Sequence, residues 1–490
     1  MPDDLRDGPR DECGVFGIYA PGSDVARLAY FALYALQHRG QESAGIATAP
    51  AGGSILAVRE QGLVSQVFDE YKLRSLIGDL AIGHVRYSTT GSSAWENTQP
   101  IVRDDNRTVG PIALAHNGNL INAVELHAKM RVDGVPFSST SDSEIIAALL
   151  ATHPADDIED AVADVLPRLK GAFSTVVMTG NKVAAFRDPQ GLRPLSIGKL
   201  PSEDGKREVY CVASETCAFD LIGATYVRDV EPGEVVTLDK NGLRSRSVAG
   251  GRRHAFCVFE HIYFARPDSL MGGRRLQVSR ARMGEILWRE SPVDADLVIP
   301  VPDSGNAAAR GVARASGLPT DDGFIKNRYV ARTFIQPGQQ LRKHGLRLKF
   351  NPLPEVVAGK RLVVVDDSIV RGNTMTQIVR MLREAGAAEV HLRISAPPIK
   401  HPCHYGIDMS ALEEMVAHGR AEREVCELVG ADSLHYLSLE GVYQAVQGVR
   451  ATHCDACFSG EYPIPGTERA SGKFAFENAP LPMVSAPVMP

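Results

Sequence analysis

Two adjacent acidic residues, Asp366 and Asp367, follow four apolar residues in the string RLVVVDDSIVRGNT (361–374). The apolar run predicts a buried parallel strand, and the polar loop after it leads into a helical pattern. A loop whose backbone N–H groups face a helix N-terminus can bind a phosphate monoester, with the hydroxyls of Ser368 and Thr374 as further donors. Carboxylates at the end of the strand can hold sugar hydroxyls, directly or through Mg²⁺. The alternative is an ordinary turn whose acids cap the helix.

A second candidate is the C-x-x-C pair Cys454 and Cys457. This spacing alone occurs in redox, zinc and iron–sulfur proteins. The chain has eight cysteines scattered over 490 residues, which do not form a disulfide framework. We therefore expect these cysteines to be ligands, nucleophiles or core residues. Cys211, Cys217 and Cys426 are predicted to be packing residues.

The predicted helices and strands that position these residues fall on either side of one boundary in the chain. Residues 13–247 alternate short strands with helices, including a strand at 13–20, a helix at 23–40 with Ser23 as its N-cap, and a helix at 119–130. This mixture predicts a layered α/β sandwich. A boundary is predicted near SVAGGRRH (247–254), where two glycines and two arginines precede a new apolar pattern.

The length, composition and net charge of the chain exclude several classes of protein. A chain of 490 residues is long enough for two or three domains, and 44% hydrophobic residues, 23% charged residues and a net charge of −6 are typical of a soluble globular protein. Nothing in this balance indicates a nucleic-acid or membrane surface. No apolar run approaches the ~20 residues that span a bilayer, and the first residues lack the apolar segment of a signal peptide. We expect a cytoplasmic protein.

The string around Asp366 and Asp367 resembles the phosphoribosyl pyrophosphate (PRPP) motif of type I phosphoribosyltransferases. The turn at Asp303, Ser304 and Gly305 resembles the pyrophosphate loop of the same family, which makes Ser304 a candidate Mg²⁺ partner beside the two acids. Ser304 could equally be the N-cap of the following helix. The PRPP-binding residues implied by the resemblance are Asp366, Asp367, Ser368, Arg371, Gly372, Asn373, Thr374, Lys326 and Arg332.

Lys326 and Arg332 lie in the basic segment KNRYVARTFIQPGQQLR (326–342), which contains interleaved aromatic residues. Such a segment could be an RNA-binding strip, although one short segment in an acidic chain gives that interpretation little weight. The segment resembles the family's flexible loop, which closes over PRPP. Closure would exclude water from an oxocarbenium-like transition state, and the two cations would face the leaving pyrophosphate.

Four strings in the first half resemble the glutaminase domain of N-terminal-nucleophile amidotransferases: QHRGQES, GHVRYST, HNGN and TSDSE. The resemblance implies that Cys13 is the nucleophile, although its spacing alone would equally suit a buried strand cysteine. A thioester route needs a thiolate, donors for the oxyanion and charges that recognise an amino acid. The implied oxyanion donors are Asn117 and the Gly118 N–H, and the implied glutamine-binding residues are Arg39, Arg86 and Asp142.

Such a nucleophile needs a base, and a free α-amine on Cys13 would supply it. An α-amino group titrates at about 7.7–8.0, close to the ~8.5 of a thiol. Residues 1–12 would then have to be removed. We predict a propeptide that ends at Glu12, as in family members with a processed leader.

Taken together, these strings resemble the family of glutamine PRPP amidotransferases, in its iron–sulfur-bearing, propeptide-processed branch. The resemblance favours a [4Fe–4S] cluster over a structural Zn²⁺ site, which the same thiolates would also satisfy. The cluster would have a structural role. The four implied ligands are Cys257, Cys403, Cys454 and Cys457.

The resemblance implies a fold and a reaction. The fold is mixed α/β, with an αββα glutaminase sandwich followed by a type I phosphoribosyltransferase domain built on a parallel sheet. The expected divisions are a propeptide (1–12), the glutaminase domain (13–252), the phosphoribosyltransferase domain with the cluster ligands (253–471) and a flexible tail (472–490). The reaction is formation of 5-phosphoribosylamine from PRPP and glutamine, with ammonia passing between the two sites.

The resemblance also implies feedback inhibition by purine nucleotides and a homotetramer. Three other functions remain open at this stage. An aminotransferase that makes glucosamine 6-phosphate shares the first half but lacks the VVVDDSIVRGNT string. A PRPP-sensing regulator would keep that string without needing the complete glutaminase set. An iron–sulfur redox sensor would not need two substrate sites.

Overall fold

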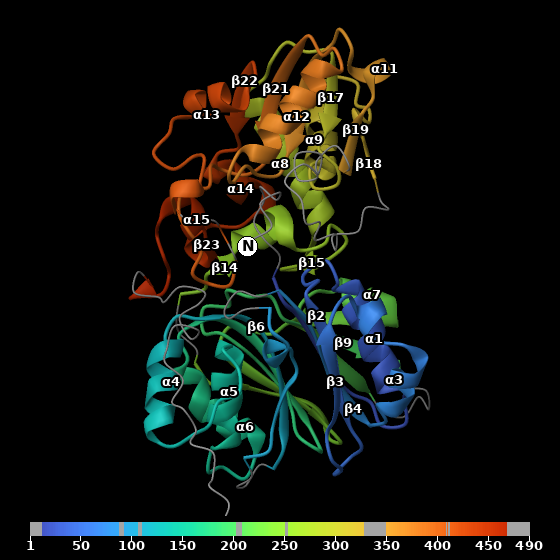
Figure 1. Cartoon of the computed structure of the whole chain (residues 1–490), viewed down its shortest axis with the longest axis vertical. Coiled ribbons are helices and arrows are strands. Elements are labelled where there is room, and N and C mark those ends of the chain that lie inside the picture. Colours follow the sequence, from blue (N-terminus) through green and yellow to red (C-terminus); the bar gives the residue numbers. More distant parts are fainter. Residues whose placement is uncertain are drawn as a thin grey trace, which may run out of the picture. The chain divides into compact units, whose positions relative to one another are not determined.

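The computed structural model describes residues 12–87, 93–105, 110–201, 208–249, 253–327, 349–407, 409 and 412–467. The chain divides into two compact units (Figure 1). The N-terminal unit contains Glu12–Arg252, His404–Gly406 and the described residues from Ile464 onward. The C-terminal unit contains Arg253–Cys403 and Ile407–Pro463. The predicted tail and most of the predicted leader lie outside the described residues.

The N-terminal unit is built on two antiparallel sheets. The seven-stranded sheet has the order β11-β9-β10-β1-β4-β2-β3, with β1 (Gly14–Tyr19), β2 (Ser43–Ala49), β3 (Leu56–Gln61), β4 (Leu80–Arg86), β9 (Ser196–Leu200), β10 (Val209–Ala213) and β11 (Thr225–Asp229). The six-stranded sheet has the order β13-β12-β8-β7-β6-β5, with β5 (Ile101–Arg103), β6 (Ile112–Leu120), β7 (Gly171–Met178), β8 (Val183–Arg187), β12 (Glu234–Asp239) and β13 (Gly242–Ser247).

Helices cover the outer face of each sheet, so the unit has four layers (Figure 1). One apolar core lies between the sheets, and one lies under each helical layer. The predicted layered sandwich is confirmed. The helices on the seven-stranded sheet are α1 (Val25–Ala35), α2 (Val64–Val67), α3 (Glu70–Ser75) and α7 (Cys217–Ile222), and those on the six-stranded sheet are α4 (Ala123–Val132), α5 (Asp142–Ala151) and α6 (Ile158–Val165).

Two predicted helix starts in this unit are wrong. The N-cap of α1 is Asp24 rather than Ser23, and its carboxylate accepts a hydrogen bond from the Arg27 N–H at 3.0 Å. A charged acceptor at a helix N-terminus is favoured by the helix dipole. Helix α4 begins at Ala123 rather than near residue 119, because the residues up to Leu120 continue strand β6 and pair with β7.

The C-terminal unit contains a four-stranded parallel sheet of β17 (Leu297–Pro300), β20 (Arg361–Asp366), β21 (Glu389–Ile394) and β22 (Ser433–Tyr436), in that order. The predicted buried strand is β20, in which Leu362 and Val364 face one core while Val363 and Val365 face another. Burial on both faces explains the continuous apolar run. The larger helices are α8 (Leu276–Glu290), α9 (Asn306–Ser316), α12 (Asn373–Glu384), α13 (Glu422–Val429) and α14 (Leu439–Val446).

Smaller elements complete this unit. They are the parallel pair β14 (Phe256–Cys257) and β23 (His453–Cys454), the antiparallel pairs β15 (Leu270–Met271) with β16 (Arg274–Arg275) and β18 (Phe324–Lys326) with β19 (Phe350–Pro352), and the short helices α11 (Pro354–Val357) and α15 (Ala456–Ser459). Within the described part of the chain, no helix combines the length and apolar character needed to cross a membrane.

The three cysteines predicted to pack do so to different degrees. Cys211 and Cys217 are buried in the core between the seven-stranded sheet and its helices. Cys426 on α13 is only half-buried at the edge of its core.

Candidate active sites

Cys13 directly precedes strand β1 and is buried. Its thiol donates to the backbone carbonyl of Tyr87 at 3.3 Å. Burial raises the pKa of this thiol to about 11, and the Tyr87 contact and the nearby Arg86 charge offset the rise only in part. With Glu12 still attached to its nitrogen, Cys13 is therefore a neutral thiol near pH 7.

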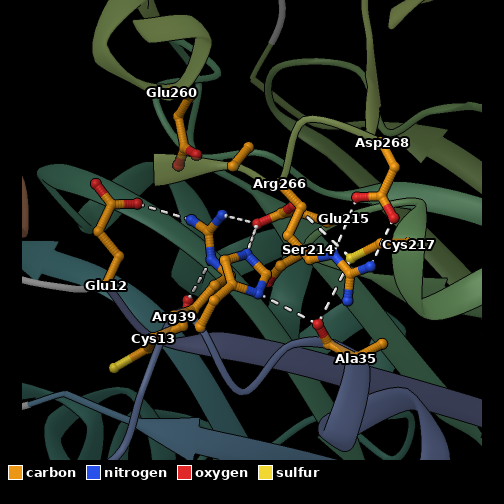
Figure 2. A network of polar contacts seen from close by, with 12 residues as sticks. Glu12, Cys13, Ala35, Arg39, Ser214, Glu215, Cys217, Glu260, Arg266 and Asp268 are labelled. Atoms are coloured by element: carbon orange, nitrogen blue, oxygen red, sulfur yellow. Dashed lines mark hydrogen bonds and ion pairs between the residues drawn. The ribbon is translucent and has the colours of Figure 1, made fainter. Parts of the chain in front are cut away.

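Arg39 connects the backbone at Cys13 to two buried acids (Figure 2). Its Nε donates to the Cys13 carbonyl at 3.0 Å, Nη2 contacts Glu12 at 2.7 Å, and Nη1 pairs with Glu215. Burial alone would raise the pKa of Glu215, but the charges and hydrogen bonds of His38 and Arg39 outweigh it, so this pKa is lowered. Arg39 thus holds the backbone of Cys13 within a buried charge network rather than standing at the protein surface.

The pairing partners of Arg39 were not foreseen from the sequence. Glu12 is 1% exposed although it lies at the end of the predicted leader, and it also pairs with the buried Arg193. Glu215 is equally buried in the string ASET. In the sequence, the only sign that Glu12 and Glu215 are buried is that each charged residue lies beside an apolar strand pattern.

Arg86 and Asp142 act on the Cys13 thiol with opposite charges. Arg86 ends strand β4 and lies 3.5 Å from the Glu42 carboxylate. Asp142 is the first residue of α5, and it accepts a hydrogen bond from the Leu120 N–H at 2.9 Å. A cation and an anion near the thiol are the groups that an α-carboxylate and an α-amino group require.

Asn117 and Gly118 lie on β6, which packs against β1 across the core between the sheets. The side-chain nitrogen of Asn117 is buried and has no hydrogen-bond partner within the described residues. Gly118 has a φ of +148°, and a Cβ there would lie 1.9 Å from the Ala172 carbonyl oxygen. Only glycine fits at this position, next to an amide donor that has no partner among the described residues.

Two buried histidines lie within the family strings, one in GHVRYST and one in HNGN, and were not singled out from the sequence. His84 contacts the His116 carbonyl at 3.1 Å, and His116 contacts the Ser143 hydroxyl at 3.0 Å. Burial lowers the pKa of His84 to about 3 and also lowers that of His116. Both imidazoles are therefore neutral at physiological pH.

In the C-terminal unit, Asp366 is the last residue of β20 and Asp367 follows it; the two are 7% and 6% exposed. The Ser304 hydroxyl donates to Asp366 at 3.0 Å, and the Ser368 hydroxyl donates to Asp367 at 2.6 Å. The pKa of Asp366 is raised well above its usual value, first by burial and then by the adjacent Asp367 charge. Two neighbouring buried carboxylates with hydroxyl groups beside them are suited to bind a cation.

The loop after these acids turns directly into α12. Gly372, with a φ of +84°, is the N-cap of this helix, so the two acids do not cap it. Asn373 and Thr374 lie in the first turn of this helix, the end whose dipole favours a phosphate. Arg371 pairs with Glu414 at 2.9 Å.

Lys326 at the end of β18 pairs with Asp303 in the turn that precedes α9. The N-cap of α9 is Gly305, which leaves Ser304 to bind Asp366 instead of capping this helix. Arg332 and most of its segment lie outside the described residues.

The four predicted cluster cysteines gather in the C-terminal unit. Cys257 and Cys454 are direct partners in the β14–β23 pair, and Cys457 lies on α15 immediately after. Lys400 donates to the Cys457 carbonyl at 2.9 Å, which brings the chain before Cys403 to the same place. The pKa of Cys457 is raised well above its usual value by burial and then by Cys257, Cys403 and Cys454.

Comparisons with known proteins agree with this arrangement. Residues 84–220 match the glutamine amidotransferase domain, and residues 282–404 match the phosphoribosyl transferase domain. Amidophosphoribosyltransferase from Mycobacterium tuberculosis is 51% identical over 98% of this chain and 91% of its own length, and the enzyme from Synechocystis sp. is 52% identical over 96% and 95%. The chain belongs to the amidophosphoribosyltransferase family. Members of this family join a glutamine amidotransferase to a phosphoribosyltransferase.

A solved amidophosphoribosyltransferase structure also resembles the chain. Glutamine PRPP amidotransferase from B. subtilis, complexed with ADP and GMP, aligns with a TM-score of 0.86 at 45% identity, over 92% of this chain and 97% of that one. A second solved structure, of the allosteric regulatory enzyme of purine biosynthesis, has the same TM-score and identity. The predicted fold class is confirmed. The phosphoribosyltransferase half excludes the glucosamine 6-phosphate alternative, and the family is one of enzymes rather than of regulators.

Proposed function

We propose that this amidophosphoribosyltransferase makes 5-phosphoribosylamine from PRPP, glutamine and water, releasing glutamate and pyrophosphate, with Cys13 as its glutaminase nucleophile. The observation that carries the assignment is the buried side-chain nitrogen of Asn117, which has no partner among the described residues and lies on the strand that packs against β1. An unsatisfied buried donor costs about 1–3 kcal/mol. Active sites accept this cost where the donor binds charge that develops during the reaction.

Each residue has a defined task in glutamine hydrolysis. The Cys13 thiolate attacks the carboxamide carbon, and the carbonyl oxygen becomes an oxyanion that accepts from Asn117 and the Gly118 N–H. The C–N bond then breaks and ammonia leaves with a proton from the base, after which water hydrolyses the thioester to glutamate. Arg86 and Asp142 bind the α-carboxylate and α-amino group of glutamine, and Arg39 supports this glutamine site.

Removal of residues 1–12 supplies the base for this step. In the chain that retains Glu12, burial raises the pKa of the Cys13 thiol to about 11, so little thiolate forms near neutral pH. A free α-amine at Cys13, with a pKa near 7.7–8.0, accepts the thiol proton within the same residue. The buried pairing of Glu12 with Arg39 and Arg193 would hold the scissile bond in place before cleavage.

The C-terminal unit carries out the transfer. Ammonia attacks C1 of the ribose of PRPP and displaces pyrophosphate, and Asp366 and Asp367 hold the ribose hydroxyls. Lys326 and Arg332 carry positive charge to the leaving pyrophosphate. The 5′-phosphate binds at the start of α12 through Ser368, Arg371, Gly372, Asn373 and Thr374.

Mg²⁺ fits the acidic end of β20. Asp366 and Asp367 are buried neighbours, a bound cation would offset the charge repulsion between them, and the Ser304 hydroxyl that donates to Asp366 adds a third oxygen. Mg²⁺ is usually held by one or two carboxylates together with substrate oxygens, as this set allows. Asp366, Asp367 and Ser304 would hold the ion, which would supply positive charge to the pyrophosphate.

We favour a [4Fe–4S] cluster over a zinc ion because the strings around all four cysteines resemble the cluster ligands of the family's iron–sulfur-bearing branch. Two observations support a shared site: Cys257 pairs directly with Cys454 across β14 and β23, and burial followed by the charges of Cys257, Cys403 and Cys454 raises the pKa of Cys457. Four thiolates are the usual ligands of such a cluster, and they would also satisfy a tetrahedral Zn²⁺ site.

The cluster has a structural role in this proposal, because glutamine hydrolysis needs no electron transfer. Protein purified without air should contain about four irons per chain and little zinc. Cys454→Ser should lose the iron and destabilise the C-terminal unit, whereas Cys426→Ser should keep it. A stoichiometry of one zinc and no iron would overturn the cluster assignment.

We extend three further features of the family to this chain. They are passage of ammonia between the two sites, feedback inhibition by purine nucleotides, and a cytoplasmic homotetramer. The B. subtilis structure complexed with ADP and GMP supports the second of these.

The stoichiometry of the two half-reactions tests the proposed function. One glutamate should form per pyrophosphate when glutamine is the donor, and ammonium salts should replace glutamine without glutamate release. Glutamate release that PRPP does not increase, and that is never accompanied by pyrophosphate release, would contradict the assignment.

A further inference from the structure

Three residues from the second half of the sequence belong to the N-terminal unit. Residues His404–Gly406 pack there, whereas Cys403 and Ile407 on either side belong to the C-terminal unit. We call residues 404–406 the inserted segment. It contacts residues almost 300 positions earlier in the chain, since Asn119 and His404 are 285 positions apart. No sequence pattern predicted it.

The inserted segment is fixed by its backbone. The Asn119 side-chain amide donates to the His404 carbonyl at 2.9 Å, and the Arg193 Nε donates to the Tyr405 carbonyl at 2.9 Å. The Tyr405 side chain is 3% exposed, and its hydroxyl binds the Thr467 hydroxyl at 2.8 Å. Backbone contacts at successive residues leave the segment little freedom to shift.

These anchors lie at the proposed oxyanion hole. Asn119 follows Gly118 directly on β6. Gly406 has a φ of +105°, and a Cβ at Gly406 would lie 3.1 Å from the Gly118 carbonyl carbon and 3.2 Å from Arg193 Nη2. The inserted segment therefore touches the residue whose N–H is one of the two donors.

Arg193 is held by β7, the strand that pairs with β6. Its carbonyl accepts from Ser174 at 3.3 Å, and Ser174 is the direct partner of Asn117 in the β6–β7 register. Asp188, fully buried in the same turn, accepts from the N–H groups of Arg193 and Phe173, both at 3.3 Å. The string FRDPQGLRPL (186–195) thus builds a buried support for Arg193.

We propose that the inserted segment is a positioning element of the glutaminase site, which holds the Asn117 and Gly118 donors where the oxyanion forms. The proposal rests on the proposed function of these two residues. None of the three residues of the segment needs to touch glutamine. Displacement of a transition-state donor lowers kcat without weakening ground-state binding.

Two substitutions test this role without changing the donors themselves. Gly406→Ala places a methyl group against Gly118, and Asn119→Ala removes the hydrogen bond to His404. Both should lower kcat for glutamine hydrolysis about 10- to 100-fold, with the KM for glutamine within twofold of wild type. The rate of pyrophosphate release with ammonium as donor should stay within twofold of wild type. That result would show that the phosphoribosyltransferase half is folded and active. Mass spectrometry should show the same N-terminus as in wild type.

Gly466→Ala is the matched control. Gly466 also has a left-handed φ, of +83°, in the N-terminal unit, but a Cβ there meets no atom within 4 Å. It should therefore carry similar backbone strain and keep wild-type kcat. The positioning role is overturned if Gly406→Ala and Asn119→Ala keep wild-type kcat, or if they lower the ammonium-dependent reaction equally. Full glutaminase activity in Asn117→Ala would instead overturn the proposed oxyanion hole.

Discussion

The two candidate sites are built in opposite ways. The PRPP site is largely one contiguous string, in which β20 ends at Asp366, the loop turns at Gly372 and α12 begins at Asn373. The glutaminase site draws its residues from the position before β1, from β4, β6 and α5, and from the residues after α1. A contiguous site depends on local backbone geometry, whereas an assembled site depends on buried contacts between distant segments. The two sites should therefore respond differently to substitution.

The largest expected effect is at the assembled site. Cys13→Ala should lower glutamine-dependent activity by at least about 10⁴-fold, because no other group can form the thioester. The ammonium-dependent reaction should remain near the wild-type rate, since its nucleophile is supplied free. Measured glutamate and pyrophosphate release would separate these two activities. Retention of glutamine-dependent activity would remove Cys13 from its proposed role.

The second largest effect is expected at the PRPP site, where substitution should impair the transferase reaction and spare glutamine hydrolysis. Asp366→Asn and Asp367→Asn should each lower pyrophosphate release about 10³-fold with either nitrogen donor, because a carboxylate that binds ribose or Mg²⁺ is lost. Basal glutamine hydrolysis should survive. If both substitutions instead abolish glutamine hydrolysis and spare the ammonium reaction, the assignment of this site is wrong.

This contrast also explains how much could be predicted from the sequence. Strand β20, its two acids and the start of α12 follow from an apolar run and the polar loop after it. The residues of the glutaminase site could be named only through the four family strings. Their supports, such as Glu215 and the inserted segment, could not be foreseen, because a buried ion pair or a backbone contact between distant segments leaves no periodic pattern.

A third test compares a buried support with an exposed one. Glu215→Gln should lower the free energy of unfolding by about 3 kcal/mol, because it leaves the Arg39 charge buried with less compensation. The pKa of Glu215 is lowered in the folded state, so this stabilisation is present above the unfolded-state value near 4.3 and is lost as the pH falls below it. Denaturant melts at pH 7 and pH 4 would measure both effects.

Glu70→Gln is the matched control for this comparison. Glu70 pairs with Arg27 and Arg74 on the surface, where solvent screens the charges. Glu70→Gln should therefore leave the free energy of unfolding unchanged. Equal effects of Glu215→Gln and Glu70→Gln would contradict the structural role assigned to the buried network.

The smallest effect is on the pH dependence of the contiguous site. The pKa of Asp366 is raised by burial and by Asp367, so between about pH 4 and this raised pKa the ligand-free folded state binds more protons than the unfolded state. The free energy of unfolding should therefore fall as the pH rises across this window and level off above it. Asp366→Asn should reduce the pH dependence of the melting temperature. If the pH dependence is the same as in wild type, the two neighbouring carboxylates do not destabilise the folded state.

The central claim is that Cys13 becomes an N-terminal nucleophile. The most direct test is mass spectrometry of the active enzyme after reaction with a diazoketone analogue of glutamine. The account predicts a chain that begins at Cys13 and carries one adduct on that residue, with loss of glutamine-dependent activity in proportion to labelling. A fully active chain that retains Glu12, or an adduct on another residue, would contradict it.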